Sequence, residues 1–305
     1  MTAHSSETVL VIDIGGTHCK FGMVRSGVPG EYSRVFSTQA LRDEDPIAAL
    51  AEMVRTVRGE IGHPVDLVVS TVPGFMEPDY DTVLFAGNIL NLNGRRLATE
   101  LSAIIGLPVL LERDSVLSLM GECAAGAGVG SNHTLGLFFG TGVGGAYIEN
   151  GMPFRGAGWA LEIGHIPFRG EGRRFEGMRT DCLETYVSGR ALQLIADRND
   201  VDISEVFAGA ATNPKLREDL DEFVRDQAFA VGTAIALFSP ATVILGGGVC
   251  SMKAFPRDRL EQLIVTNSPA DESRRPLDLR WAQLGWKGAL FGAFEVVRRN
   301  RTTTT

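Results

Sequence analysis

The sequence has few cysteines, no long apolar run and no excess of basic residues. Its four cysteines are scattered over 305 residues and form no disulfide-like framework, which favours a reducing compartment. No apolar run reaches the ~18 residues that span a bilayer, and the first residues lack a secretory signal pattern. The net charge of −8 argues against non-specific nucleic-acid binding, which depends on a basic surface. We therefore expect a cytoplasmic protein that binds neither membranes nor nucleic acid.

Glycine is abundant, with 36 residues, and two glycine-rich turns each separate a pair of strand-like runs, one within 9–24 and one within 135–148. Glycine carries no Cβ and tolerates positive φ, so the backbone N–H groups of such turns can approach phosphate closely. Two turns about a domain's length apart predict two similar half-molecules that clamp one nucleotide for phosphoryl transfer. The residues expected to face its phosphates are Gly15, Gly16, Thr17, Gly140, Thr141 and Gly142, with hydroxyl groups from both threonines.

The second turn also matches the dinucleotide-binding fingerprint G-x-G-x-x-G over 140–145. That fingerprint requires a helix whose N-terminus receives the pyrophosphate. Here the chain continues as a short strand pattern and closes with Asn150-Gly151, a turn typical of hairpins, so we reject this alternative. Neither turn continues as the Gly-Lys-Ser/Thr of a P-loop. Ordinary hairpin turns without a ligand are a further alternative, against which Asp13 at the head of the first turn argues.

Strand and helix patterns alternate along the chain and predict an α/β fold in two lobes. Buried strands are expected at 64–73, 106–112 and 243–249, and helices at 45–61, 97–105, 114–125, 186–197, 215–237 and 288–298. A glycine-rich break at 126–131 marks the boundary between the lobes. We expect a small lobe over 1–126, completed by the C-terminal helix 288–300, and a large lobe over 127–287.

Asp13 ends a continuous apolar strand, where an unpartnered carboxylate is costly to bury. It is a candidate to hold Mg²⁺, directly or through the water shell of the ion, because Mg²⁺ favours a carboxylate together with phosphate oxygens. The alternative is an aspartate that only accepts hydrogen bonds from the turn backbone. Lys20 follows in the next strand, where it could either bind phosphate or be solvated.

Asp114 follows a buried strand and precedes a helix. Aspartate is a preferred N-cap residue, so a purely capping role is one interpretation. The carboxyl end of a buried strand is also where α/β folds place their active sites, and a kinase needs a carboxylate to accept the proton of the attacking hydroxyl. The sequence alone leaves both roles open.

A glycine-rich stretch at 156–165 contains Glu162 and His165. In such a loop they could bond sugar hydroxyls as acceptor and donor, and the histidine could also ligate a metal. The alternative is a structural hydrogen-bonded pair.

Together these segments resemble the ROK family of sugar kinases, in the actin-like ATPase superfamily, over nearly the whole chain. Asp13–Thr17 with Lys20 is similar to the first phosphate motif of the family, and 140–165 is similar to its signature segment. Gly247 and Gly248 resemble its nucleotide-side turn. The resemblance implies the two-lobed, ribonuclease H-like fold of this superfamily, with nucleotide and sugar in the interlobe cleft.

The resemblance also implies roles for individual residues. It implies that ATP and Mg²⁺ serve phosphoryl transfer to a hexose, at its 6-hydroxyl, with Asp114 as the catalytic base. The sugar ligands that it implies are Asn88, Arg113, Asp114, Glu162, His165 and Glu184. Within the family, Arg113 before the catalytic aspartate and the segment 164–167 look most similar to D-allose kinases. Family analogy further implies a homodimer.

The chain departs from the family pattern in two places. Many members hold a structural Zn²⁺ with the histidine of the signature and three following cysteines, but here Phe175 and Gly177 replace the first two, and only Cys182 remains. One histidine and one cysteine cannot build a closed tetrahedral zinc site. We therefore expect no zinc and a looser loop, with Phe175 replacing the metal by apolar packing. Leu161 stands where the family usually has glycine, so the backbone that presents Glu162 is expected to differ.

Alternative functions are also considered. The family includes repressors, so a sugar sensor without catalysis is one alternative, although a mere sugar binder needs neither Asp13, Asp114 nor two phosphate turns. Such repressors carry a DNA-binding extension, for which we expect no room before the first strand. Polyphosphate could replace ATP as the donor. Spacing does not show which epimer is bound, so glucose, mannose, N-acetylmannosamine and allose all fit the pattern.

Overall fold

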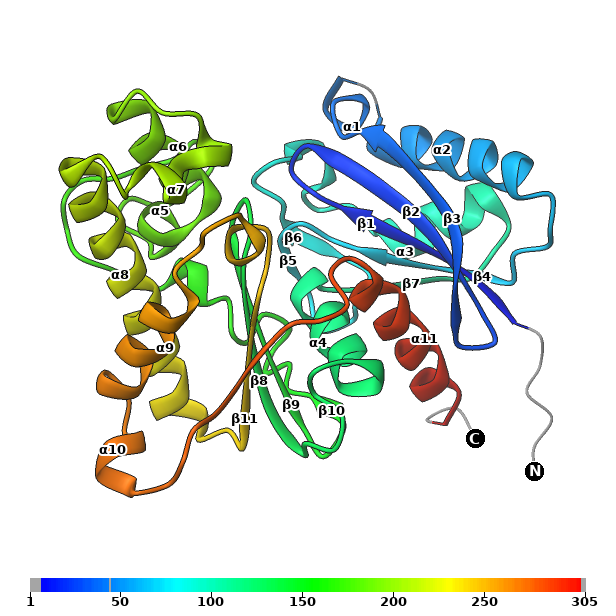
Figure 1. Cartoon of the computed structure of the whole chain (residues 1–305). Helices are drawn as coiled ribbons and strands as arrows, with labels where there is room; N and C mark the ends of the chain where they lie inside the picture. The colour runs from blue at the N-terminus through cyan, green and yellow to red at the C-terminus, as the bar shows by residue number, and fades with distance from the viewer. Residues whose placement is uncertain (1–6, 44, 303–305) are drawn as a thin grey trace. The chain divides into compact units, whose positions relative to one another are not determined.

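The computed structural model describes residues 7–43 and 45–302 of the chain (Figure 1). These residues form two compact units. Unit 1 contains the chain up to Gly126, the short segment Arg155–Ala160 and the chain from Trp286 onwards. Unit 2 contains Ala127–Phe154 and Leu161–Gly285. The chain therefore enters unit 1 a second time between Phe154 and Leu161.

Unit 1 is built on a five-stranded mixed sheet with the order β3-β2-β1-β4-β7 (Figure 1). β1 (Thr8–Ile14) pairs antiparallel with β2 (His18–Arg25), which pairs antiparallel with β3 (Val28–Ser37). β4 (Leu67–Thr71) runs parallel to β1, and β7 (Val109–Glu112) runs parallel to β4. The carboxyl ends of β1, β4 and β7 therefore lie along one edge of the sheet.

The longer helices of unit 1 are α2 (Pro46–Ile61), α3 (Leu97–Ile105), α4 (Asp114–Ala125) and α11 (Lys287–Thr302). Both faces of β1 are buried, because side chains alternate along a strand. Leu10 and Ile12 join the core formed with α2 and α3, whereas Val9 and Val11 join the core formed with α4 and α11. Burial on both faces explains the continuous apolar run of this strand in the sequence.

Shorter elements of unit 1 are α1 (Ala40–Asp43), β5 (Phe75–Met76), β6 (Val83–Phe85) and η1 (Leu90–Leu92). β5 and β6 form a separate two-stranded sheet. The segment Arg155–Ala160 packs on it, because the rings of Trp159 and Phe75 have centroids 5.9 Å apart. A Cβ on Gly158 would lie 2.6 Å from the Met76 carbonyl oxygen, so the backbones approach closely here.

Unit 2 repeats the topology of unit 1. Its five-stranded sheet has the order β10-β9-β8-β11-β12, formed by β8 (His133–Phe139), β9 (Val143–Glu149), β10 (Met152–Pro153), β11 (Thr242–Gly246) and β12 (Asp278–Trp281). The first three are antiparallel neighbours, whereas β11 runs parallel to β8 and β12 runs parallel to β11. In both units a glycine turn connects the first strand to its antiparallel neighbour, which confirms the expectation of two similar halves.

The helices of unit 2 are α5 (Glu184–Val187), α6 (Gly189–Arg198), α7 (Val206–Gly209), α8 (Pro214–Phe238), α9 (Arg257–Thr266) and α10 (Ala270–Ser273), with 3-10 turns η2 (Ile163–His165), η3 (Ile203–Glu205) and η4 (Val249–Ser251). α8 begins where the Asn213 side chain accepts a hydrogen bond from the Leu216 amide at 3.1 Å and Pro214 occupies the first turn. Its apolar face, with Leu220 and Phe223, joins the core that also contains residues of β8 and β11.

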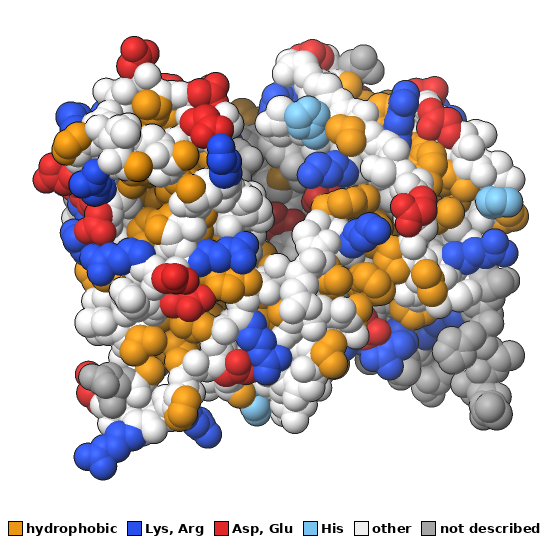
Figure 2. All heavy atoms as spheres, viewed as in Figure 1, with side chains coloured by type: hydrophobic (Ala, Val, Ile, Leu, Met, Phe, Trp, Pro, Cys, Tyr) orange, Lys and Arg blue, Asp and Glu red, His pale blue; other side chains and the backbone are white. Residues whose placement is uncertain are grey.

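The α/β fold agrees with the sequence prediction, and the dinucleotide-binding alternative is contradicted because β9 follows the second glycine turn where that fold requires a helix. Asn150 and Gly151 have φ of 49° and 75°, both in the left-handed region that the predicted hairpin turn requires. Figure 2 shows acidic and basic side chains interspersed over the face in view. Nowhere in 7–43 or 45–302 does a helix combine the length and the apolar character needed to cross a bilayer.

Candidate active site

The first glycine turn is held by hydrogen bonds that Thr38 and Arg42 donate to its carbonyl groups. The Thr38 hydroxyl donates to the Gly15 carbonyl at 2.9 Å, and the Thr38 amide donates to the Thr17 carbonyl at 3.0 Å. The Arg42 guanidinium donates to the Gly16 carbonyl between them. The carbonyl of one residue and the N–H of the next point in opposite directions across a trans peptide, so the amides of Gly16 and Thr17 face away from these donors. The turn therefore presents N–H groups on one side, as an anion site requires.

The glycines of the two turns do not adopt positive φ. Gly15, Gly16, Gly140 and Gly142 all lie outside the left-handed region, which corrects that part of the sequence interpretation. A Cβ on Gly142 would lie 2.5 Å from a carboxylate oxygen of Glu184, so a side chain there would require the Glu184 carboxylate to move.

Glu184 joins the second glycine turn to the predicted sugar segment of unit 2. Its carboxylate accepts a hydrogen bond from the Val143 amide at 2.8 Å. Gly164 packs on the same carboxylate, since a Cβ there would lie 3.1 Å from its oxygen. The turn itself is closed by the Gly140 amide, which donates to the Gly142 carbonyl at 2.9 Å. The structure thus places this predicted sugar ligand against the backbone of the phosphate turn.

The predicted nucleotide-side turn follows β11. Gly247 has a φ of +97°, and a Cβ there would lie 2.3 Å from the Phe139 carbonyl oxygen, so this position requires glycine. A Cβ on Gly248 would meet none of the described atoms within 4 Å outside its own chain neighbours. Gly248 is exposed, as are Thr17 and Thr141, so these three backbone positions are accessible to a ligand.

Two predicted acidic residues lie at one edge of the unit 1 sheet. Asp13 is on β1, Thr71 ends β4 and Asp114 begins α4 after β7. The Thr71 hydroxyl donates to an Asp13 carboxylate oxygen at 3.3 Å and accepts from the Ile14 amide at 2.7 Å. Asp114 is close enough for its charge to affect the ionisation of Asp13. This edge therefore brings together the two carboxylates for which the sequence predicts a cation and a proton-accepting role.

The pKa values of both carboxyl groups are raised. Burial raises the pKa of Asp13 from its ordinary value of 3.8 to about 6, and the charge of Asp114 adds to the rise. Lys20, which faces Asp13 across β1 and β2, and Thr71 act in the opposite direction. The pKa of Asp114 is raised because the surrounding protein removes water, although part of the side chain stays exposed, and Arg113 opposes this rise. A raised pKa makes a carboxylate a better proton acceptor.

Asp114 is the first residue of α4, and Arg113 occupies the N-cap position. The interpretation of Asp114 as the N-cap is therefore wrong, because the N-cap is the residue before it. Its carboxylate accepts a hydrogen bond from the adjacent Ser115 amide at 2.6 Å. A carboxylate in the first turn is also favoured by the helix dipole.

A buried ion pair precedes Asp114 in the chain. Glu112, at the end of β7, is fully buried and pairs with the Arg155 guanidinium, while its other oxygen accepts from the Arg113 amide at 3.0 Å. The Arg155 guanidinium also lies 4.9 Å from the centroid of the Tyr80 ring. Arg113 is only 1% exposed, so the structure places this predicted sugar ligand inside the unit. The sequence interpretation missed Glu112 and Arg155, because a lone charged residue at a strand end or in a loop is usually solvated.

Asn88 lies in the loop between β6 and η1. Its carbonyl accepts a hydrogen bond from Nε of Arg42 at 2.7 Å. The same guanidinium holds Gly16, so one arginine contacts both the first phosphate turn and the segment of a predicted sugar ligand. The sequence interpretation did not single out Arg42, which belongs to none of the motifs.

Glu162 and His165 frame η2 in unit 2, where the His165 amide donates to the Glu162 carbonyl at 3.0 Å. His165 is half-buried, and burial together with the charge of Arg179 lowers its pKa, which favours the neutral ring. Arg179 also donates to the His165 carbonyl at 2.5 Å. Leu161 has a φ of +61°, so the leucine keeps the left-handed backbone that glycine would favour.

Cys182 and Phe175 occupy the loop after His165. Cys182 is buried, and its thiol donates to the Arg179 carbonyl at 3.1 Å. Phe175 packs against the unit 2 core, and the Arg190 guanidinium lies 5.9 Å from the centroid of its ring. Within the described part of the chain, no three His, Cys, Asp or Glu side chains gather as a protein-built metal site requires. A Mg²⁺ ion held by one carboxylate and by phosphate oxygens needs no such group.

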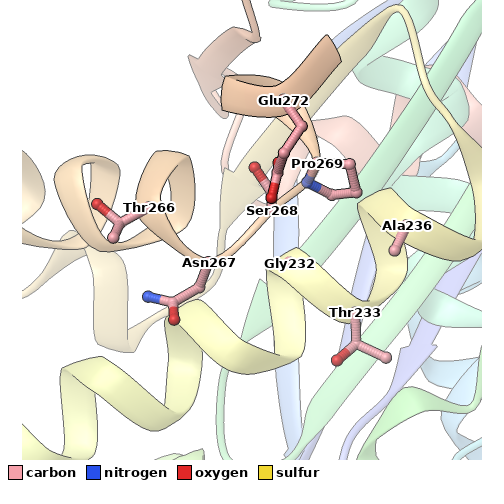
Figure 3. Close-up of a pocket in the computed structure, with 8 residues that line it drawn as sticks. All are labelled: Gly232, Thr233, Ala236, Thr266, Asn267, Ser268, Pro269 and Glu272. Atoms are coloured by element: carbon pink, nitrogen blue, oxygen red, sulfur yellow. The ribbon is translucent and has the colours of Figure 1, made fainter.

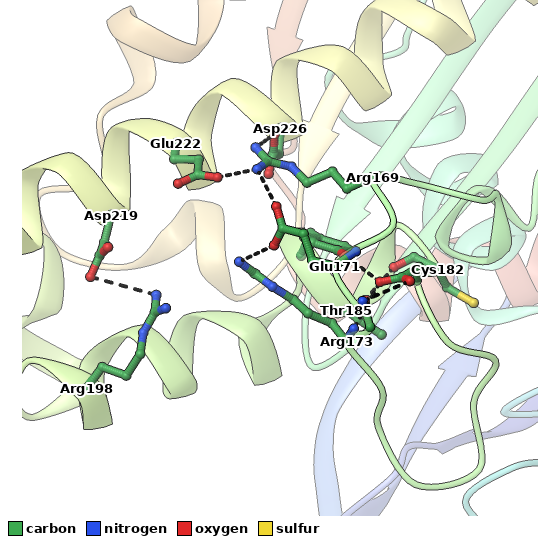
Figure 4. Close-up of polar contacts among 12 residues, drawn as sticks. Arg169, Glu171, Arg173, Cys182, Thr185, Arg198, Asp219, Glu222 and Asp226 are labelled. Carbon is green, nitrogen blue, oxygen red and sulfur yellow. Dashed lines mark hydrogen bonds and ion pairs between the residues drawn. The ribbon is translucent and has the colours of Figure 1, made fainter.

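Ionic contacts tie the same loop to α8 (Figure 4). Arg169 pairs with the buried carboxylate of Asp226 at 2.6 Å and with Glu222. It also pairs with Glu171 at 3.1 Å, which in turn pairs with Arg173 at 3.0 Å. These contacts connect the loop to a long helix without any metal ligand.

A pocket of about 380 Å³ lies in unit 2, between α8 and the connection of α9 to α10 (Figure 3). Its lining consists of Gly232, Thr233, Ala236, Thr266, Asn267, Ser268, Pro269 and Glu272. The predicted site residues are not among them. The pocket is therefore separate from the residues that carry the candidate chemistry.

Comparisons with known proteins identify the family. A model of the ROK family matches residues 9–300, so the chain belongs to this family. A glucokinase of Streptomyces coelicolor is 27% identical over 313 residues, which cover 94% of this chain and 96% of that protein. An N-acetyl-D-glucosamine kinase of Pectobacterium carotovorum is 25% identical and covers 85% of this chain and 88% of its own length.

Solved structures support the same assignment. A ROK family glucokinase from Streptomyces griseus, in complex with glucose and AMPPNP, matches with a TM-score of 0.76 and 27% identity. The match covers 96% of this chain and 99% of that one. The α/β fold of this chain is therefore the actin-like ATPase fold of ROK sugar kinases.

Proposed function

We propose that this chain transfers the γ-phosphoryl group of ATP to the 6-hydroxyl of a hexose. The observation that carries this proposal is the repeated arrangement of a glycine turn after the first strand of each sheet, together with Asp13 and Asp114 at one edge of the unit 1 sheet. Relatives that match along most of the chain are a glucokinase and an N-acetyl-D-glucosamine kinase, and the related glucokinase structure holds glucose and an ATP analogue.

Asp114 is the catalytic base in this proposal. As the hexose oxygen attacks the γ-phosphorus, its proton passes to the Asp114 carboxylate, and the bond from phosphorus to the ADP oxygen breaks. The raised pKa of Asp114 favours this proton transfer. Backbone N–H groups at Gly16 and Thr17 stabilise charge on the phosphate oxygens. The further ATP contacts are Gly15, Lys20, Gly140, Thr141, Gly142, Gly247 and Gly248, and the sugar contacts are Asn88, Glu162, His165 and Glu184. Arg113, the remaining predicted sugar ligand, is 1% exposed, and its charge acts on Asp114.

Asp13 fits a magnesium ion. Mg²⁺ is usually held by one or two carboxylates with phosphate oxygens and water, and Asp13 offers one carboxylate at the edge where the phosphate turn begins. The Thr71 hydroxyl orients that carboxylate. Burial and the charge of Asp114 oppose ionisation of Asp13, so a cation beside it would relieve an unfavourable charge. When bound, the ion neutralises negative charge on the phosphates.

D-Allose is the hexose that we propose, with glucose, N-acetylglucosamine and N-acetylmannosamine as the alternatives. The residues that support allose are Arg113, beside the base, and 164–167 in the predicted sugar segment. The test is an ADP-release assay with Mg-ATP across these sugars, mannose and fructose. Turnover that strongly favours allose would support the proposal. Turnover that favours another hexose would keep the kinase and replace the substrate.

The role of Asp114 is tested by D114N, with D258N as a control that removes an exposed carboxylate of α9. We expect kcat to fall by about 10²–10⁴-fold in D114N while calorimetry still detects hexose binding. Turnover at the wild-type rate in D114N would rule out this base. Binding of a hexose without turnover, with either ATP or polyphosphate, would identify a sugar sensor. Light scattering tests the homodimer that family analogy implies.

A further inference from the structure

We propose that Arg42 is a positioning residue that couples the nucleotide turn of unit 1 to the segment that carries Asn88. What these two segments bind rests on the proposed function, whereas the contact itself does not. Arg42 lies on α1 and is exposed, so its side chain has no core to pack in. Its position is instead defined by the groups that its guanidinium contacts.

The guanidinium contacts both segments at once. Its Nε donates to the Asn88 carbonyl at 2.7 Å, and its Nη2 donates to the Gly16 carbonyl. Its Nη1 donates to the side-chain oxygen of Gln39 at 3.1 Å, and Gln39 in turn donates to Asp43 at 2.7 Å. The planar fork of arginine holds two acceptors in a fixed geometry, whereas the point charge of lysine does not.

The backbone around Arg42 strengthens this link. The side-chain amide of Asn91 donates to the Arg42 carbonyl at 2.8 Å, so the Asn88 segment contacts both the backbone and the side chain of this residue. Leu41 is fully buried and anchors α1 in the core of unit 1. Thr38, just before α1, holds the Gly15 carbonyl through its hydroxyl. The two predicted binding segments are therefore joined to one anchored helical turn.

This arrangement has a consequence for ligand binding. The orientation of the Gly16 carbonyl also sets the direction of the Thr17 amide, which is a predicted phosphate donor. Because one side chain fixes Gly16 and Asn88 together, a ligand that orders one segment reduces the entropy lost when the other is ordered. Nucleotide and hexose should therefore bind with positive coupling, of the same size in both directions.

The test compares R42A and R42K with R55A, which removes an exposed arginine of α2 that pairs with Glu52 at 2.7 Å. AMPPNP affinity is measured by calorimetry with and without a saturating concentration of the hexose that gives turnover. In the wild type and R55A, we expect hexose to tighten AMPPNP binding by about 5-fold or more. R42A and R42K should both lose most of this factor. If hexose tightened AMPPNP binding in R42K as much as in the wild type, a positive charge alone would suffice and the fork of arginine would not be needed. An unchanged factor in R42A would overturn the proposal.

Hydrogen exchange tests the contact without any need for catalysis. In R42A, but not in R55A, amides in both 15–18 and 87–91 should exchange faster than in the wild type. Faster exchange in only one of these segments, or in neither, would overturn the coupling. A wild-type chain that phosphorylates no hexose would overturn the proposed function, whereas the exchange result would still decide the role of Arg42.

Discussion

The carboxylate of Glu184 accepts a hydrogen bond from the Val143 amide at 2.8 Å, at the point where the second glycine turn becomes β9. Val143 is 5% exposed, so its amide depends on this acceptor rather than on water. In unit 1, Arg42 donates to the Gly16 carbonyl of the first turn. Each unit therefore fixes its glycine turn with a charged side chain that also contacts a predicted sugar segment.

The first prediction concerns this carboxylate. E184A should lower the free energy of unfolding by about 1–3 kcal/mol, because the buried Val143 N–H loses its acceptor. E184Q keeps an acceptor of the same shape and should lose less. Denaturant unfolding measures both variants, with E176A as the control because Glu176 is exposed in the neighbouring loop. If E184A unfolds at the same denaturant concentration as E176A, the hydrogen bond does not stabilise the turn.

The second prediction follows from the pKa of Asp13, which is raised from 3.8 to about 6. The folded state therefore binds more protons than the unfolded state between these pH values, so the free energy of unfolding falls as pH rises through this window. At pH 7.5 without Mg²⁺, D13N should be more stable than the wild type by at most about 3 kcal/mol. The difference should fall to about 0.5 kcal/mol at pH 4 and vanish below pH 3.

The control variant for this prediction is D79N, which should change stability in the opposite direction to D13N. Backbone hydrogen bonds from Thr82 and Asp81 lower the pKa of Asp79, so D79N should be less stable than the wild type at pH 7.5. Mg-ATP should raise the melting temperature of the wild type more than that of D13N, because the ion needs the carboxylate. Equal pH profiles for D13N and the wild type would show that Asp13 is not destabilised by its surroundings.

Local patterns in the sequence predicted the two glycine turns and the buried strands, because each depends on residues that are neighbours in the chain. β1 could be predicted because burial on both faces makes it a continuous apolar run. β3 was missed because all of its residues are exposed or half-buried and show no apolar alternation. β3 is an edge strand of the unit 1 sheet, and a strand without apolar alternation cannot be predicted from its sequence pattern.

The contacts that organise the candidate site could not be predicted in this way. Arg42 and Asn88 are 46 positions apart, and Arg155 and Glu112 are 43 apart. Pairs of this kind depend on which loops the completed fold brings together, and single charged residues in loops are usually solvated. The sequence also does not predict that Arg155–Ala160 belongs to unit 1, because this too depends on contacts between distant parts of the chain.

The third prediction concerns the loop that lacks zinc ligands. R169M should lower the free energy of unfolding by about 3–5 kcal/mol, because it leaves the carboxylate of Asp226 buried without its partner. Burial already raises the pKa of Asp226 and Arg169 opposes this rise, so R169M should recover stability as pH falls and the carboxyl group is protonated. The double variant R169M/D226N should recover much of the loss at neutral pH.

R198M is the matched control for this loop, since the partly exposed Arg198 pairs with Asp219 at 3.7 Å (Figure 4). Its removal should change stability by less than about 1 kcal/mol. We expect a chelator to leave the melting temperature of the wild type unchanged, because ionic contacts of Arg169 already tie the loop to α8. A large fall on chelation, with zinc found by elemental analysis, would contradict this account.

The fourth prediction concerns Leu161, which has a φ of +61° where the chain returns to unit 2. Its side chain packs on the unit 2 core, whereas the left-handed backbone costs a non-glycine residue about 1–2 kcal/mol. L161A and L161G both lose the packing, but only glycine also loses the strain. L161G should therefore be more stable than L161A by about 1 kcal/mol in urea unfolding.

A helical position provides the comparison that separates backbone strain from side-chain loss. Ala98 is the second residue of α3, so A98G should be less stable than the wild type by at most about 1 kcal/mol, the reverse of the order expected at position 161. Leu161 directly precedes Glu162, and a glycine there would let the backbone before this predicted ligand sample more conformations. We therefore expect L161G to raise KM for the hexose more than KM for ATP. An L161G variant no more stable than L161A would mean that the leucine is not strained.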